Sequence, residues 1–135
     1  MQLDGYQRCV GGADKKIKFC CGKDITQDLN AIFSAMGSEQ KAAALDTANR
    51  AIQKHGEKDC LLATKASVLI QLNEYQQAES LVEKLLEHNP HNPVALGQKT
   101  TLLAVEDKVE EAVHCLQRAL EPVSYTHLRA HETDY

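Results

Sequence analysis

The chain has 135 residues, a length that suits one domain or a short repeat array. Hydrophobic residues make up 43% of it, but aromatic residues make up only 4% and Trp is absent, so the core must be built from Leu, Ala, Val and Ile. Seven Gly and three Pro are too few for a turn-rich all-β fold, and packed helices are expected instead. The net charge of −4 is too small to demand a nucleic-acid partner.

Nothing in the sequence indicates export or insertion into a membrane. No basic start is followed by a long apolar run, and no stretch approaches the ~20 apolar residues that span a bilayer. The five Cys are an odd number, and three of them lie in one short segment. This usage fits a reducing compartment better than a secreted disulfide framework, and we expect a cytoplasmic protein without a membrane partner.

The first segment of the chain carries those three cysteines. Cys9 opens the motif, the pair Lys15 and Lys16 follows, and Cys20 and Cys21 close it. In length and register this run resembles the SEC-C zinc motif, known from the tail of the bacterial preprotein translocase ATPase and from many small bacterial proteins. The resemblance implies a zinc ion held by Cys9, Cys20 and Cys21, and a bacterial protein.

The segment departs from that motif at Gly11, which stands where the second Cys ligand belongs. Structural zinc takes four ligands in a closed tetrahedron, so water, a distant His or a second chain would have to complete the site. The alternative is a segment without metal that packs Ile17 and Phe19 on the helices behind it. No His lies near the three thiols, and we expect no catalytic cysteine.

Behind this segment the sequence repeats with a period of 34 residues, and small and apolar residues fall into register. The aligned positions are Ala44, Ala78 and Ala112, then Ala48, Val82 and Leu116, then Ala51, Leu85 and Ala119. Offsets of four and three place these side chains on one face of a helix. A small residue at the head of that face allows two helices to approach closely.

Each row of the repeat predicts two helices, because apolar residues recur at helical spacing. The expected helices are residues 25–36 and 39–54, 60–72 and 75–88, and 94–105 and 108–121. Gly56 is expected to end the first pair, and Asn92 before Pro93 is expected to cap the first helix of the third.

These rows resemble the tetratricopeptide repeat (TPR) family. The second row carries the resemblance best, through Leu62, Ala66, Leu69, Tyr75, Ala78, Val82 and Pro90, and the third matches through Leu96, Leu103, Ala112, Leu116 and Ala119. The family implies an all-α, right-handed solenoid of about three antiparallel helix pairs. The expected organisation is a cysteine arm (1–24), three helix pairs (25–58, 59–92 and 93–122) and a tail (123–135).

In TPR proteins the first helix of each pair lines a concave groove that holds a peptide or helix of a partner. By that resemblance the groove here is lined by Leu29, Phe33, Met36, Ala63, Ser67, Ile70, Gly97, Thr101 and Ala104. These residues are apolar or small, and the Lys, Arg and Asn clamp that holds a C-terminal carboxylate in some members is not evident. We therefore expect a hydrophobic segment as ligand.

The tail, residues 124–135, resembles the translation product of sequencing-adaptor DNA found at the ends of unrelated predicted proteins. We therefore expect it to be non-native, and expect the natural chain to continue differently after Val123. His127 and His131 lie four residues apart, a spacing that could bind metal on a helix and that we interpret as accidental.

The sequence predicts a protein–protein interaction scaffold and no enzyme, because no P-loop, dinucleotide fingerprint, zinc-protease helix or hydrolase elbow is present. No small-molecule substrate is indicated. One alternative is a zinc-dependent adaptor that acts through the cysteine arm. Another is a regulatory repeat fragment of a larger protein or enzyme.

Overall fold

The chain forms a row of helices joined by short turns. A computed structural model describes residues 9–12 and 22–120. This part of the chain has no strand and contains the helices α2 (Gly22–Gly37), α3 (Lys41–His55), α4 (Asp59–Gln71), α5 (Tyr75–His88), α6 (Pro93–Val105) and α7 (Val109–Leu120). The all-α prediction is confirmed, and every predicted helix end lies within three residues of the observed one. No helix among these residues combines the length and the hydrophobicity that crossing a membrane requires.

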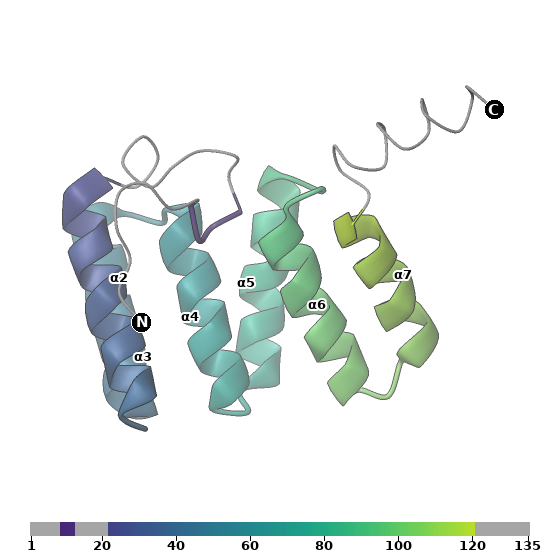
Figure 1. The fold of residues 1–135 in the computed structure, drawn as a ribbon, viewed down its shortest axis with the longest axis horizontal. Helices are drawn as coiled ribbons and strands as arrows, with labels where there is room; N and C mark the ends of the chain where they lie inside the picture. The colour runs from purple at the N-terminus through teal and green to yellow at the C-terminus, as the bar shows by residue number, and fades with distance from the viewer. Residues whose placement is uncertain (1–8, 13–21, 121–135) are drawn as a thin grey trace.

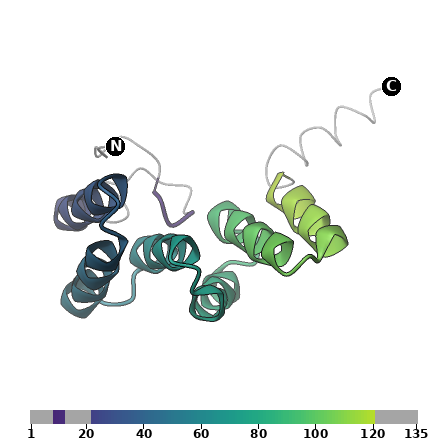
Figure 2. The same cartoon turned by 90° about the horizontal axis from the view of Figure 1, so that it is seen from below.

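Consecutive helices pack side by side as antiparallel neighbours (Figure 1). The first helices of the pairs also touch one another, α2 against α4 and α4 against α6, whereas the second helices make no contact of that extent. Helices on the inner side of a curved stack lie closer together, so α2, α4 and α6 form the concave side (Figure 2). The predicted TPR-like solenoid is therefore confirmed.

The period of 34 residues is visible in the backbone of the turns. Glu39, Asn73 and Asp107 have φ angles of 61°, 62° and 63°, and each follows the first helix of its pair. The next residue then donates its N–H to a carbonyl five positions back, in the bonds Gln40 to Ala35 (2.8 Å), Glu74 to Leu69 (2.9 Å) and Lys108 to Leu103 (2.9 Å). This closure is the Schellman motif. The predicted start of the second helix at Glu39 was wrong by two residues, because Glu39 is the left-handed residue of the turn.

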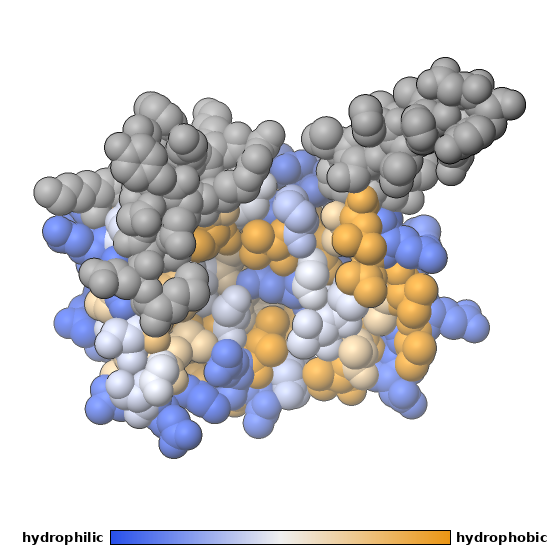
Figure 3. Space-filling model, in the orientation of Figure 1, coloured by the Kyte–Doolittle hydropathy of each residue, from blue (hydrophilic) through white to orange (hydrophobic). Residues whose placement is uncertain are grey.

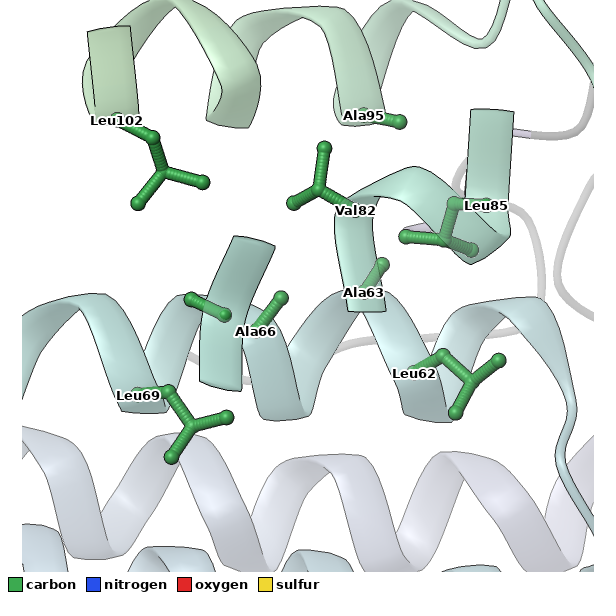
Figure 4. Close-up of a cluster of buried hydrophobic side chains, with 9 residues drawn as sticks. Leu62, Ala63, Ala66, Leu69, Val82, Leu85, Ala95 and Leu102 are labelled. Carbon is green, nitrogen blue, oxygen red and sulfur yellow. The ribbon is translucent and has the colours of Figure 1, made fainter. Parts of the chain in front are cut away.

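The aligned small residues lie in the helix–helix contacts, as predicted. Ala44 and Ala78 are fully buried, and Ala112 is nearly so. Around Ala78, apolar side chains from three successive helices pack together and form the core in the middle of the stack (Figure 4). Its members include Leu62, Ala66 and Leu69 from α4, Val82 and Leu85 from α5, and Ala95 and Leu102 from α6. Each pair thus buries its apolar face against the next pair.

The two predicted helix-end signals are confirmed. The Asn92 side-chain oxygen accepts hydrogen bonds from the N–H groups of Val94 (3.0 Å) and Ala95 (3.2 Å), and Pro93 occupies the first helical position of α6. Gly56 follows α3 with a φ of 88°, a conformation that glycine adopts without steric cost.

Replacing Ala78 by glutamate tests the close helix contact. A buried carboxylate without a partner, in a space that holds one methyl group, should lower the free energy of unfolding by about 3 kcal/mol or more. Urea unfolding followed by circular dichroism measures the change. The control Ser80→Glu adds the same group two residues away on the exposed side of α5 and should cost little. Equal losses in both variants would show that the register is wrong.

Replacing Glu39 by glycine tests the turn geometry. The left-handed conformation is unfavourable for glutamate and is tolerated by asparagine. We expect Glu39→Gly to raise the free energy of unfolding by about 1 kcal/mol, and Asn73→Gly to raise it by less. The urea midpoints of the two variants are compared. A larger gain at Asn73 would contradict the claim that the left-handed conformation is more strained at Glu39 than at Asn73.

Candidate functional site

A pocket of about 360 Å³ lies between α4 and α6, on the row of first helices. It is lined by Ser67, Ile70 and Gln71 from α4 and by Pro93, Val94, Gly97, Gln98 and Thr101 from α6. The volume is at the small end of the range for ligand pockets and suits one or two side chains of a bound segment. We call this pocket with its lining residues the α4–α6 groove.

Small residues on the α6 side keep this groove open. Gly97 lies in the middle of α6, and a Cβ added there would meet no atom within 4 Å. Thr101 lies one turn further along the helix and is exposed. Its hydroxyl donates to the Gly97 carbonyl at 3.2 Å, which satisfies the hydroxyl within α6.

Gln98 sets the spacing of the two helices that form the groove. Its Nε2 donates to the Ala63 carbonyl at 2.8 Å and to the Ser67 hydroxyl at 2.9 Å, both on α4. Its Oε1 is buried and has no hydrogen-bond partner, an arrangement that costs free energy and is uncommon in proteins. The amide therefore holds α6 on α4 and leaves one acceptor unsatisfied.

The predicted binding residues do not all lie on one surface. Ser67, Ile70 and Thr101 come together in the α4–α6 groove, with Gly97 between them. Leu29 and Ala63 are core residues instead, at 0% and 1% exposure, and Ala63 points into the cluster of Figure 4. The prediction that these two line an open groove was wrong, because they lie on the side of their helices that meets the next helix of the stack.

Phe33 and Met36 lie elsewhere on α2. Both are half-buried, Phe33 against the cluster around Leu29 and Met36 against the cluster around Ile32. They do not line the α4–α6 groove. Of the predicted surface, the α4–α6 groove contains the members that lie on the second and third pairs, namely Ser67, Ile70, Gly97 and Thr101.

Gln98 was missed from the sequence, although a signal for it exists. Asn30, Thr64 and Gln98 occupy the same position in the three rows of the repeat. Thr64 is buried and its hydroxyl donates to the Cys60 carbonyl at 2.7 Å. A polar residue that recurs at one register on an apolar face indicates a hydrogen-bonded core position.

The groove itself carries no charge, since none of its lining residues is acidic or basic. Charged pairs lie outside it. The Lys84 ammonium contacts Glu57, and this hydrogen bond is the main cause that lowers the pKa of the Glu57 carboxyl. Lys99 contacts Glu83 at 2.9 Å and joins α6 to α5. An uncharged groove favours an apolar ligand, and the hydrophobic segment expected from the sequence stays a prediction.

Residues 9–12 contact the helix stack near the start of α4 (Figure 1). The Asn92 side-chain amide donates to the Gly11 carbonyl at 2.7 Å. The same side chain caps α6, so one buried asparagine joins residues 9–12 to the boundary between the second and third pairs. Cys9 is buried in the cluster that contains Leu29 and Cys60.

The two glycines of this segment are required by close contacts. A Cβ at Gly11 would lie 2.5 Å from the Cys60 backbone nitrogen. At Gly12, where φ is 89°, it would lie 1.8 Å from the Asn92 side-chain oxygen. A side chain at position 11 therefore has no room beside the backbone of Cys60.

The remaining metal predictions fall outside the described residues. Cys20 and Cys21 belong to residues 13–21, and the proposed non-native tail belongs to residues 121–135, neither of which the structure describes. Among residues 9–12 and 22–120, no group of three or more His, Cys, Asp and Glu side chains is placed to hold a metal ion. Cys60 and Cys115 are buried residues of α4 and α7.

A curved stack of antiparallel helix pairs with a 34-residue period and an inner groove defines a TPR protein. A profile of the family described as Psidin, N-terminal TPR repeats region, matches residues 27–127. The chain belongs to this family. Comparison with individual curated proteins finds no match. Solenoids of this type present their concave surface to other proteins, and the chain has the architecture of a protein-interaction scaffold.

Replacing Asn92 by aspartate separates its two roles. The carboxylate keeps the cap of α6 but faces the Gly11 carbonyl without a donor, so residues 9–12 should lose their attachment. Hydrogen exchange should accelerate at Gly12, whose N–H is bonded to the Cys9 carbonyl, while Val94 and Ala95 stay protected.

The companion variant Asn92→Ala removes both contacts and should lower the free energy of unfolding by about 2 kcal/mol. If Asn92→Asp exposed Val94 and Ala95 as strongly as Asn92→Ala does, the two roles would not be separable and the assignment would fail.

Proposed function

We propose that this protein is a scaffold that holds an apolar segment of a partner protein in the α4–α6 groove. The observation that carries the proposal is that Ser67, Ile70 and Thr101, from two helices that are distant in sequence, line one open, uncharged pocket. The segment would bury an apolar side chain against Ile70 and Val94.

Polar groups around the groove supply orientation. The exposed Gln71 side chain lies at the rim, and the Ser67 hydroxyl, which accepts from Gln98, retains its own hydrogen for donation to a ligand. A few polar groups around an apolar pocket are the usual means by which a site selects among apolar ligands. An amphipathic helix and an extended strand both present apolar side chains that alternate with polar groups, so either form of a partner segment suits the groove.

Filling the groove at Gly97 tests this proposal. Because an added side chain at Gly97 projects into open space, Gly97→Trp should block the groove while the fold is kept. Peptides selected from a random display library on the wild-type protein should be apolar or amphipathic. Their binding to Gly97→Trp should fall by about tenfold or more.

Gly37→Trp is the matched control, since Gly37 also has open space around it and lies at the end of α2, away from the groove. It should bind the selected peptides as the wild type does. Peptides that bind Gly97→Trp and Gly37→Trp equally would place the binding surface elsewhere.

A second candidate function, a zinc-dependent adaptor, is favoured by the geometry at Cys9. The Gly11 N–H donates to Cys9 Sγ at 3.4 Å, a bond that stabilises a thiolate. Cys60 belongs to the same buried cluster and is the second residue of α4, where the helix N-terminus also favours a thiolate. We propose that Cys60 supplies the fourth ligand that Gly11 lacks, beside Cys9 and the pair Cys20 and Cys21. Zinc would then fasten the arm to the repeats.

Metal analysis of three proteins tests this candidate. The wild type purified without chelator should contain stoichiometric zinc, Cys60→Ser should lose it, and Cys115→Ser should keep it, because Cys115 lies in a separate cluster. Chelator should lower the melting temperature of the wild type and of Cys115→Ser, but not that of Cys60→Ser. A wild type free of zinc and indifferent to chelator would exclude the zinc-dependent form of this function.

A further inference from the structure

The Gln98 side chain brings an unmet hydrogen-bond acceptor to the α4–α6 groove. Gln98 is 8% exposed and is one of the residues that line the groove. Among the described residues, nothing donates a hydrogen bond to its Oε1. A buried acceptor without a donor makes a protein less stable, and such atoms are uncommon enough to point to a role. A ligand of the groove is one source of the missing donor.

The contacts of Gln98 fix which way its amide faces. The Nε2 amino group donates to the Ala63 carbonyl and to the Ser67 hydroxyl. A carbonyl oxygen can only accept, so an amide turned by half a rotation would set its own oxygen against the Ala63 carbonyl. The amino group is therefore held on α4, and Oε1 is the atom that remains without a donor.

Ser67 supplies a donor beside this acceptor. Its hydroxyl oxygen accepts from Gln98, and its own hydrogen is left for a ligand. The nitrogen and oxygen of one amide are about 2.3 Å apart. Since Gln98 Nε2 lies 2.9 Å from Ser67 Oγ, Gln98 Oε1 and Ser67 Oγ are at most about 5.2 Å apart. Two hydrogen bonds between oxygens, each about 2.7 Å long, span that distance. One hydroxyl of a ligand can thus donate to Gln98 and accept from Ser67.

The rest of the groove requires an apolar body on the same ligand group. Ile70 and Val94 line it, and none of its lining residues is charged. Along this side of α6 the surface is mostly pale or orange, which means weakly polar or apolar (Figure 3). The volume of about 360 Å³ leaves a serine or threonine side chain loosely held and has room for an aromatic ring.

Tyrosine is the side chain that meets both requirements. Its ring is apolar, and its hydroxyl both donates and accepts hydrogen bonds. Phenylalanine would leave the Gln98 oxygen and the Ser67 hydrogen unpaired. The indole N–H of tryptophan donates but cannot accept, so it would serve Gln98 alone.

We propose that the α4–α6 groove recognises a tyrosine side chain of the partner segment, with the ring against Ile70 and Val94 and the hydroxyl between Gln98 Oε1 and Ser67 Oγ. This inference rests on the proposed function, because it names the side chain that the scaffold holds. Gln98 Oε1 is buried in the described conformation, so a small turn of the amide accompanies binding. The last torsion of a glutamine side chain is broad, and a modest turn costs little.

Binding of p-cresol and toluene tests the chemistry of the groove without a partner. These molecules are the side chains of tyrosine and phenylalanine, each ending in a methyl group. Titrations of the labelled full chain, followed by nuclear magnetic resonance, should shift the Gln98 side-chain amide and the Gly97 and Thr101 backbone signals. We expect p-cresol to bind about tenfold more tightly than toluene, because a site that pairs a hydroxyl rejects the analogue without it. A purely apolar groove would prefer toluene, and equal or tighter binding of toluene would overturn the inference.

Three variants assign the preference to its residues. Gln98→Met keeps the length of the side chain and removes the amide, and Ser67→Ala removes the donor; both should lose most of the preference for p-cresol. Ser80→Ala, on the exposed side of α5, is the control and should keep it. The preference is a ratio of two affinities on one variant, so a general loss of binding does not imitate the result. Ser67→Ala leaves the bond from Gln98 to Ala63 in place and gives the answer even if Gln98→Met does not fold. A preference that persists in Ser67→Ala would overturn the inference.

Peptides selected on the wild-type protein separate this inference from the proposed function. They should share a tyrosine, and its replacement by phenylalanine should weaken binding by about tenfold. Peptides that require an open groove, as shown by their loss on Gly97→Trp, but tolerate phenylalanine would overturn the inference and leave the proposed function standing. Peptides that bind Gly97→Trp as well as the wild type would overturn the proposed function itself.

Discussion

The structure depends on one constraint, which is that a single helix pair cannot bury its own apolar face. Each pair needs the next one, and the next one fits only if the helices approach closely at the head of the second helix. Ala44, Ala78 and Ala112 provide that approach, and the left-handed residues Glu39, Asn73 and Asp107 turn the chain back at the same step of every pair. The concave side and the groove both follow from this stacking.

The sequence predicted the helices well because their signals are local. Apolar spacing, the Asn92–Pro93 cap and Gly56 each act within a few residues, and the structure places them as expected. The candidate site was harder to predict, because exposure depends on the angle between successive pairs. Leu29 and Ala63 have the composition of groove residues, but the stack turns them inward. The contact of Gly11 with Asn92 joins residues 81 positions apart, and no local pattern indicates it.

The groove and residues 9–12 are linked by contacts at the starts of α4 and α6. Asn92 begins the helix that forms one wall of the groove, and the same amide holds Gly11. Cys60, which lies against Gly11, is near the start of the other wall. The N-terminal segment thus bridges the starts of α4 and α6. Any ligand or metal that strengthens this contact should also stiffen the groove, because both use the same two helix ends.

The α4 and α6 helices lie side by side on the inner face, held at a fixed spacing by Gln98. Nuclear Overhauser spectroscopy of the labelled protein tests this arrangement most directly. We expect the Gln98 side-chain amide protons to show contacts to the Ser67 β-protons and the Ala63 α-proton, and to exchange slowly with water. A Gln98 amide that exchanges as fast as an exposed one, and shows no contact to α4, would contradict the account.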